Sequence, residues 1–296
     1  MRKVYHYQTK EKLISSVRKN ILFTPERLSD ILSEREDGES MVHKNKVNAA
    51  RDYFVCKSNE LIQKGRYNLT TQQQKIVLFA ISKIKKSDDP RQMYELSIEE
   101  LCSVCGFNIS GGSYYQNLKQ DMRKLTTPVW VQFPDNSEWT VSWFADVGIV
   151  PLSGTVYVRF HEKIWDFLFD LKEKYTQYHL SDVLVFKNKY AIRLFEILRS
   201  HFTQAELDQG TEKEITLSLD HLRKQLCVSA YPEWKEFNRN VIKKAVDEIN
   251  LYTEQMKVEY TTRKTGRFVS EICFTVYSPD LPERIRRYRN SEKRLS

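Results

Sequence analysis

The stretch from residue 215 to residue 276 constrains the fold more than any other part of the chain. Ser218 precedes apolar residues at helical spacing, which predicts a helix that the Ser218 hydroxyl caps and that ends near Cys227. After a short break, apolar side chains again recur at helical spacing as far as Asn250. This stretch is therefore expected to begin with two helices joined by a turn.

A predicted hairpin follows these helices. Segments 256–261 and 268–276 alternate like paired strands, and segment 263–267 between them contains three cations and one glycine. The face of the longer helix opposite its apolar stripe has long polar side chains. They are Lys235, Arg239, Asn240 and Lys243. A polar helix followed by a cationic hairpin predicts a winged helix over duplex DNA, although an ordinary solvated helix face is the alternative for these charges.

An earlier part of the chain repeats this order. The hexapeptide Leu-Ser-Ile-Glu-Glu-Leu that begins at Leu96 matches Leu-Ser-Leu-Asp-His-Leu at Leu217. The helical positions upstream match as well, with Ile76 corresponding to Ile192. Two copies of one module are the economical explanation of these matches.

Helix signals also mark the first copy. Thr70 with Gln73, and Ser97 with Glu100, have the spacing of capping boxes at the start of two helices. A third helix, about 113–125, turns polar side chains outward. They are Ser113, Gln116, Asn117, Gln120, Arg123 and Lys124. Such side chains contact bases and phosphates, so we predict DNA contacts here; the alternative is that this helix lies against a dimer partner.

Strands are predicted after Pro128, because proline cannot continue the third helix. Segments 129–133, 139–150 and 155–160 have the composition of strands. Segment 161–174 is expected to form a further helix that closes the first copy.

The predicted fold class is α+β, with two winged-helix modules in tandem. Residues 1–51 are interpreted as an N-terminal helical appendage and linker, and residues 52–173 as the first module. Residues 174–280 are interpreted as the second module, and residues 281–296 as a basic, mobile tail.

Charge and composition narrow the function classes. The 296-residue chain has a net charge of +8, which favours a polyanionic partner. No segment approaches the roughly 18 apolar residues of a membrane helix, and the N-terminus lacks the continuous apolar segment of a signal peptide. Five cysteines, an odd number, suit a reducing compartment. These features predict a cytoplasmic protein without membrane contact.

No catalytic pattern is present in the sequence. The histidines never form the His-apolar-His pair of rolling-circle nickases, and no Gly-x-x-x-x-Gly-Lys phosphate loop occurs. Cys102 and Cys105 have half of a zinc-binding pattern without a second half, so we interpret them as buried thiols. We therefore expect no enzyme activity, no metal and no cofactor.

Several segments resemble plasmid replication initiators of the iteron-binding Rep class. Those of the second module are YAIRLFEIL (190–198), ITLSLDHLR (215–223), WKEF (234–237), AVDEIN (245–250) and KTGR (264–267). Those of the first module are NEL (59–61), YNLT (67–70) and QQKI (73–76). The resemblance extends from about Asn59 to Pro279. Its strength lies in the order of the segments, because no single one is as specific as a metal-ligand pattern.

This resemblance implies a function and partners. Members of the class bind short direct repeats, called iterons, at a plasmid origin, open the adjacent duplex and help to load the host's replicative helicase. Dimers of many members also repress their own promoter. The implied partners are double-stranded origin DNA, a homodimer in equilibrium with the monomer, the host initiator protein and the helicase.

The resemblance also implies DNA contacts by position. The residues concerned are Lys235, Asn238, Arg239, Lys264 and Arg267. Lys243 on the polar helix face and Arg263 in the predicted turn complete the candidate set. Where the class often has a run of arginines, this chain has Asn238-Arg239-Asn240, so the bases it recognises do not follow from its relatives.

Two other functions are compatible with the residues. A transcriptional repressor of the same fold would bind an inverted repeat and support no replication. An interaction scaffold would hold protein partners with its first module and residues 1–50, and its DNA binding would be incidental.

Overall fold

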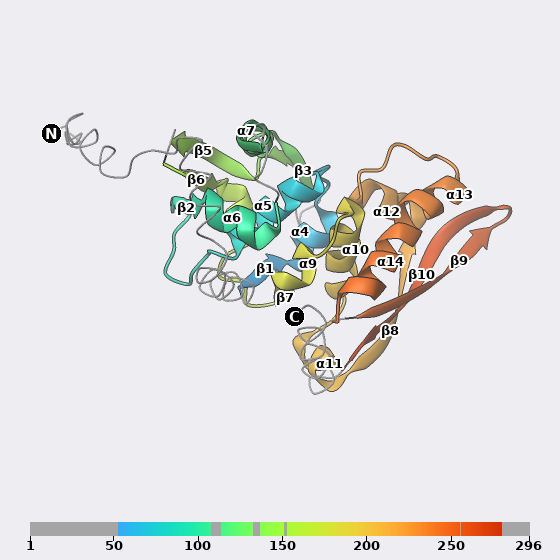
Figure 1. The fold of residues 1–296 in the computed structure, drawn as a ribbon. Helices are drawn as coiled ribbons and strands as arrows, with labels where there is room; N and C mark the ends of the chain where they lie inside the picture. Colours follow the sequence, from blue (N-terminus) through green and yellow to red (C-terminus); the bar gives the residue numbers. More distant parts are fainter. Residues whose placement is uncertain (1–52, 108–113, 133–136, 151–152, 255, 280–296) are drawn as a thin grey trace, which may run out of the picture. The chain divides into compact units, whose positions relative to one another are not determined.

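The chain divides into two units, residues 1–48 and residues 49–296. The computed structural model describes part of the second unit, namely residues 53–107, 114–132, 137–150, 153–254 and 256–279 (Figure 1). The predicted appendage and the predicted basic tail lie outside the described residues.

Short helices and strands alternate in the first half of the described chain. They are β1 (Phe54–Ser58), α4 (Asn59–Lys64), α5 (Thr71–Ile81), β2 (Tyr94–Ser97), α6 (Ile98–Cys105), α7 (Tyr114–Lys124), β3 (Val129–Gln132), β4 (Glu138–Val141), β5 (Phe144–Val150), β6 (Thr155–Phe160), α8 (Glu162–Trp165) and β7 (Tyr175–His179). Strands β2, β6 and β5 form an antiparallel sheet in the order β2-β6-β5, and β3 pairs with β4 as a separate hairpin.

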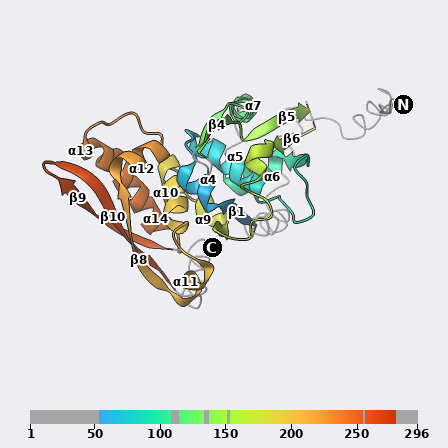
Figure 2. The same cartoon turned by 180° about the vertical axis from the view of Figure 1, so that it is seen from behind.

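A helical layer on a three-stranded sheet makes up the second half. Its elements are α9 (Ser181–Leu184), α10 (Lys189–Arg199), α11 (Gln204–Gln209), β8 (Thr211–Ser218), α12 (Leu219–Gln225), α13 (Trp234–Phe237), η1 (Asn238–Ile242), α14 (Lys243–Tyr252), β9 (Lys257–Thr265) and β10 (Phe268–Ser278). The antiparallel sheet has the order β8-β10-β9. Helices α12 and α14 contact this sheet, and α10 contacts α14 (Figure 1, Figure 2).

The sheet of the second half corrects the predicted two-stranded ribbon. Strand β8 is a third strand, paired with β10 along its whole length. Its sequence signal is weak because exposed charged residues such as Glu212 and Glu214 alternate with few apolar ones, and only Ile215 is buried.

Segment 139–150, predicted as one strand, is divided between β4 and β5. The break falls at Ser142 and Trp143, and the indole of Trp143 is buried in the core. The Trp143 carbonyl accepts a hydrogen bond from the His161 backbone N–H at 3.2 Å, which continues the β5–β6 pairing, whereas β4 pairs with β3, so the two parts of the segment belong to different sheets.

The long helix predicted over 161–174 is wrong. Only the short helix α8 forms, and the backbone of Asp170 and Lys174 adopts the left-handed region, with φ of 47° and 51°. A right-handed helix cannot continue through such residues. The chain then enters β7, which pairs with β1. Buried apolar residues of both halves form one continuous core, so the packing does not mark a boundary between residues 173 and 174. That boundary stays a prediction.

Helix starts agree with two of the three predicted caps. Thr70 and Gln73 form a complete capping box, with each side chain bonded to the other residue's backbone N–H. The Ser97 hydroxyl accepts from the Glu100 N–H at 3.2 Å, so Ser97 caps the helix as predicted, but the Glu100 carboxylate accepts from Lys83 and does not complete the predicted capping box. Ser218 makes no such bond and ends strand β8 instead, so its predicted cap is wrong. Asp220 in the first turn of α12 places a favourable negative charge at that helix terminus.

The longer helix of the second half contains a turn of π-helix that the sequence did not predict. Helix α13, the five-residue π turn η1 and α14 follow one another without a break, and the backbone N–H of Lys243 donates to the carbonyl of Asn238. A hydrogen bond across five residues widens the helix by one residue per turn. The π turn therefore shifts the polar face of α14 relative to that of α13.

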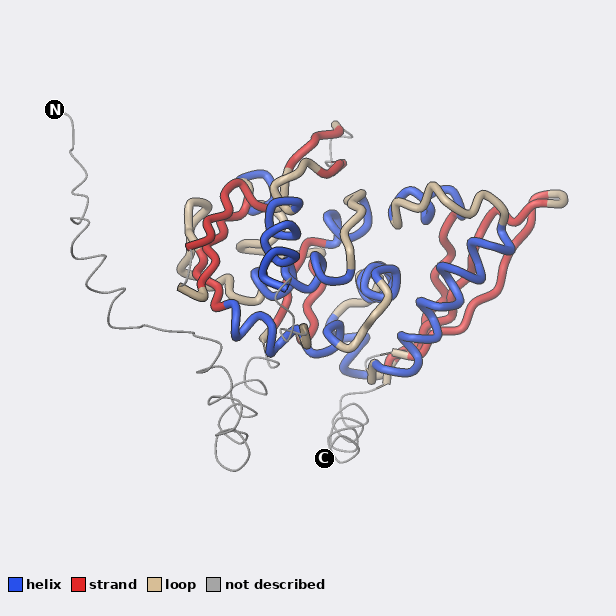
Figure 3. Tube along the Cα trace, turned by 45° about the horizontal axis from the view of Figure 1, so that its top comes forward, coloured by secondary structure: helices blue, strands red, loops and turns tan. Residues whose placement is uncertain are grey.

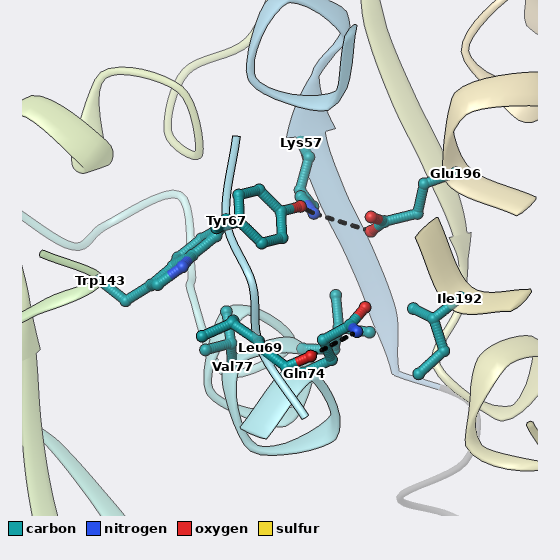
Figure 4. Close-up of a pocket in the computed structure, with 9 residues that line it drawn as sticks. Lys57, Tyr67, Leu69, Gln74, Val77, Trp143, Ile192 and Glu196 are labelled. Atoms are coloured by element: carbon teal, nitrogen blue, oxygen red, sulfur yellow. Dashed lines mark hydrogen bonds and ion pairs between the residues drawn. The ribbon is translucent and has the colours of Figure 1, made fainter. Parts of the chain in front are cut away.

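A buried ionic cluster joins β1, α10 and the loop after α4 (Figure 4). Lys57 donates to the Glu196 carboxylate at 2.7 Å, and Arg193 donates to it at 3.1 Å. Tyr178 donates to Glu196 at 2.6 Å, and Lys57 donates to the Tyr67 hydroxyl at 3.2 Å. We use the name buried ionic cluster for these five residues. Because they are far apart in sequence, the cluster ties the first half of the chain to α10.

Candidate nucleic-acid interface

Two predicted cations lie exposed on the longer helix of the second half. Lys235 and Arg239 are exposed, and neither forms an ion pair with any residue that the structure describes. The opposite side of the same helix is anchored, because Phe237, Val241 and Ala245 are buried. This arrangement leaves both cations facing solvent, as the helical periodicity predicted.

Asn238 occupies a different environment from its charged neighbours. Its side chain is half-buried, and its Oδ1 atom accepts a hydrogen bond from the Tyr260 hydroxyl on β9 at 2.7 Å. The contact joins the π turn to the hairpin β9–β10. The amide oxygen of Asn238 is therefore occupied within the protein, while its amide nitrogen has no acceptor among the described residues.

Lys243 is exposed but paired. Its Nζ atom lies 2.8 Å from the Asp247 carboxylate one turn later on α14, and both side chains are about 60% exposed. The hydrogen bond to Asp247 and the charge of that carboxylate raise the pKa of Lys243. The Asp247 carboxylate therefore competes with any phosphate that approaches Lys243.

The hairpin β9–β10, which we call the wing, is longer than its sequence suggested. Its strands extend to Thr265 and from Phe268, so the turn contains only Gly266 and Arg267 (Figure 3). Gly266 has a φ of 63°, whereas Arg267 has no positive φ. Two-residue turns with this pattern match the twist of the flanking strands and favour glycine at the first position.

Three predicted cations lie at this end of the wing. Lys264 and Arg267 are exposed and form no ion pair within the described part of the chain. Arg263 is also exposed, but its guanidinium lies 2.9 Å from the Glu214 carboxylate and 3.9 Å from that of Glu271. Among the described residues, the wing tip therefore presents two unpaired positive charges and one that is partly neutralised.

Helix α7 of the first half also has an exposed polar face. Leu118 and Met122 are buried and orient the helix, and Gln73 of α5 donates to Asp121 at 2.7 Å. The exposed candidates on its outer face are Gln116, Asn117, Gln120, Arg123 and Lys124. Ser113 lies outside the described residues. The structure thus places five of the six candidates of this helix on one solvent-facing surface.

One positioning residue escaped the sequence reasoning. Arg223 at the end of α12 donates to the carbonyls of Tyr231 and Pro232 at 2.7 and 3.0 Å, and its guanidinium lies 4.1 Å from the centre of the Phe237 ring. It therefore fixes the turn before the cationic helix. The sequence does not reveal this role, because Arg223 lies at the polar end of a helix and its hydrogen-bond partners are backbone carbonyls in the non-helical segment that follows.

The remaining predicted sites have simple surroundings. Cys102 and Cys105 are buried free thiols, and Cys102 donates to the Tyr114 hydroxyl. Within the described residues, no group of three or more His, Cys, Asp or Glu side chains could hold a metal ion. No helix in the same part of the chain is long and apolar enough to cross a membrane.

Comparison with known protein families gives two matches in tandem. Residues 54–199 match a family described as "Initiator Replication protein, WH1". Residues 218–276 match a family described as "Initiator Rep protein, WH2".

Individual relatives agree with these matches. A "Replication initiation protein" from Escherichia coli is 27% identical over 229 residues, which are 76% of this chain and 70% of the relative. A "PI protein" from Escherichia coli is 26% identical over 148 residues, and the matched region covers 46% of each chain. The present chain thus matches less than half of that second relative.

The fold is similar to that of a solved structure. A structure described as "Crystal structure of Pi initiator protein in complex with iteron DNA" aligns with a TM-score of 0.63. The alignment covers 77% of this chain and 98% of the other, at 19% sequence identity. At this identity the likeness establishes the fold.

Proposed function

The chain belongs to the initiator replication protein family, with the α+β fold of two tandem winged helices that its sequence predicted, and we propose that it binds the direct repeats of a plasmid origin. In this proposal the helix formed by α13, η1 and α14 enters the major groove. The wing lies on the adjacent backbone. Both elements belong to one module, so they reach a single DNA segment together.

One observation supports this proposal most strongly. Four cations on the helix and the wing, namely Lys235, Arg239, Lys264 and Arg267, are exposed and have no ion-pair partner among the described residues. Such groups gain more from a phosphate than a paired cation does, because no existing interaction must first be broken. Each phosphate contact also releases condensed counterions, which gives binding its salt dependence.

Specificity is assigned to the helix and affinity to the wing. Arg239 is the candidate for a base contact, because arginine can donate two hydrogen bonds to one guanine. Lys264 and Arg267 at a two-residue turn suit phosphates, which carry no sequence information. Asn238 contributes mainly by bonding Tyr260 and holding the helix to the wing.

Helix α7 is proposed as a second DNA contact. Its exposed amides and cations are of the residue types that bind bases and phosphates in protein–DNA complexes. A dimer partner would cover the same surface, so the two uses exclude each other. This exclusion suits an equilibrium between a dimer and a DNA-bound monomer.

The later steps of initiation rest on the family. We include opening of the origin, loading of the host's replicative helicase with the host initiator, and repression of the protein's own promoter by its dimer. They are supported by the family membership and by the resemblance of residues 59–279 to iteron-binding initiators.

A salt series tests the binding step. The purified protein is titrated against direct repeats that flank its own gene and against shuffled duplexes of equal length. A preference of about a thousandfold or more supports specific origin recognition. Equal and steeply salt-dependent binding to both duplexes contradicts it and favours an interaction scaffold.

A replication assay tests the initiator step. A plasmid that contains only this gene, its flanking DNA and a selectable marker should replicate in a suitable host. Specific DNA binding without replication would leave a transcriptional repressor as the better description, particularly if the bound site is an inverted repeat.

A further inference from the structure

Phe268 at the tip of the wing is the most exposed large apolar side chain in the described residues. It is 80% exposed and directly follows the turn residue Arg267. An isolated apolar residue on a surface is ordinary. The location of Phe268 is less ordinary, because it shares the tip of the hairpin β9–β10 with the cations Arg267, which directly precedes it, and Lys264, which pairs with Val269 on the other face (Figure 1).

An irregularity in β10 determines which way Phe268 faces. In a regular strand Phe268 would share a face with Ile272, four residues later, which is buried in the core. The pairing with β9 shifts between Val269 and Glu271, leaving Ser270 as an extra residue. Such a bulge moves the residues beyond it to the opposite face of the sheet.

The register confirms this reversal. Phe268 pairs with Thr265, whereas Ile272 pairs with Thr262. Thr265 and Thr262 are three residues apart and therefore lie on opposite faces of β9. Phe268 thus lies on the face of the sheet opposite the one that Ile272 presents to the core.

Hydrogen bonds hold the bulge in place. The Thr265 hydroxyl donates to the Ser270 hydroxyl at 3.0 Å, and the Ser270 hydroxyl donates to the Arg263 carbonyl oxygen at 3.4 Å. These bonds stabilise the bulge at Ser270, and the bulge places Phe268 on the face of the sheet away from the core. Burial of this ring in a complex would recover the hydrophobic free energy that is lost by exposing it in the free protein.

We propose that Phe268 is an apolar wedge for the minor groove of the bound repeat. This inference rests on the proposed DNA-binding function. Lys264 and Arg267 bind the phosphates on the two sides of the groove, while the ring packs on the sugars and partly unstacks one base step. Inserted apolar side chains of this kind kink the duplex toward the major groove. Flexible pyrimidine–purine steps are the easiest to kink, so the wedge adds a sequence preference at a position without base-specific hydrogen bonds.

The test compares Phe268→Ala with Phe268→Leu in the full-length protein. Val185→Ala is the matched control, because Val185 is an exposed apolar residue, 43% exposed, that lies at the end of α9, outside the elements assigned to DNA. The duplex has end labels for energy transfer, which report its bend, and 2-aminopurine at successive steps under the wing, which reports unstacking.

Phe268→Ala is expected to weaken binding about tenfold, to reduce the bend and to abolish the 2-aminopurine signal. Phe268→Leu should retain most of all three, and Val185→Ala should change none. Unchanged affinity, bend and fluorescence in Phe268→Ala would overturn the wedge.

The experiment separates this inference from the proposed function. If the wild-type protein prefers the repeats but Phe268→Ala behaves like it, the function stands and the wedge is wrong. If the wild type binds all duplexes equally while Phe268→Ala still loses affinity and bending, the wedge stands and specific origin recognition is wrong.

Discussion

The cations of the buried ionic cluster and those of the wing tip have opposite surroundings. Lys57 and Arg193 are almost fully buried, and both pair with the Glu196 carboxylate. Lys264 and Arg267 are exposed, and no carboxylate of a described residue pairs with them. Both pairs contribute equally to the net charge of +8. Only the second pair can reach a phosphate, so burial and pairing, not the charge count, decide which cations are available to DNA.

The buried cluster also has its own dependence on pH. Burial alone would raise the pKa of Glu196, but the charges of Lys57 and Arg193 and the hydrogen bonds from Lys57 and Tyr178 outweigh it, so the pKa lies below its ordinary value. A carboxyl with a lowered pKa stabilises the fold above its unfolded pKa, and this stabilisation is lost as pH falls through the folded value. Acid should therefore weaken the cluster before it affects Lys264 and Arg267 of the wing, which pair with no carboxylate of a described residue.

The largest expected effect comes from neutralising Glu196. Glu196→Gln leaves Lys57 and Arg193 buried without a compensating charge, and the free energy of unfolding should fall by about 3 to 5 kcal/mol. Urea denaturation followed by circular dichroism measures the change. The free energy of unfolding of this variant should also fall less as the pH is lowered, because glutamine at position 196 cannot be protonated.

Asp247→Asn is the matched control for stability. It removes one carboxylate charge from the exposed pair with Lys243, and such pairs contribute less than about 1 kcal/mol. If both variants lose the same free energy, the buried cluster contributes no more than a surface ion pair and the comparison between the two regions fails.

These two regions were not equally predictable from the sequence. The wing and its helix are formed by residues near one another in the chain, and periodicity placed Lys235 and Arg239 on the solvent face correctly. The buried cluster joins Lys57 to Glu196, which are 139 residues apart. No local pattern distinguishes a lysine that will be buried from one that stays exposed. Such a contact depends on the tertiary fold.

The errors in the predicted fold also come from tertiary contacts that no local sequence pattern shows. The apolar residues of segment 161–174 predicted a long helix. The structure instead has the short helix α8, and the chain continues into β7, which pairs with the distant strand β1. The π turn at Asn238–Ile242 is associated with a contact to the wing, made by Asn238 and Tyr260. The capping box at Thr70 was predictable, because both of its partners lie within one helical turn.

Arg239→Ala tests the exposed region where specificity is expected. The variant should lose about 1 to 3 kcal/mol of binding free energy on the repeat if Arg239 contacts a base, with relaxed specificity at that position. Its fold should remain intact, because Arg239 has no ion-pair partner among the described residues. Competition titrations with repeats that differ at single positions measure both effects. An equal loss on repeat and shuffled duplex would assign Arg239 to a phosphate.

A smaller effect should distinguish free from paired cations within the wing. Lys264→Ala is expected to weaken binding uniformly and to make the salt slope shallower by about 0.9, the value for one phosphate contact. Arg263→Ala should change the slope less, because Glu214 already pairs with that guanidinium at 2.9 Å. Binding constants at five salt concentrations suffice. Equal slope changes would show that the ion pair opens freely on binding, and an unchanged slope in Lys264→Ala would remove the wing from the interface.

The smallest expected effect concerns Lys243, whose surroundings lie between the two extremes. Asp247→Asn removes the carboxylate that pairs with Lys243 at 2.8 Å, which leaves the ammonium free for a phosphate. Affinity for duplex should rise by about twofold, the equivalent of about 0.4 kcal/mol, and the salt slope should become steeper. The same change in a Lys243→Ala background separates the causes. A gain that persists without Lys243 reflects removal of a negative charge from the helix face. A gain that disappears shows that pairing alone had kept Lys243 from acting like Lys264.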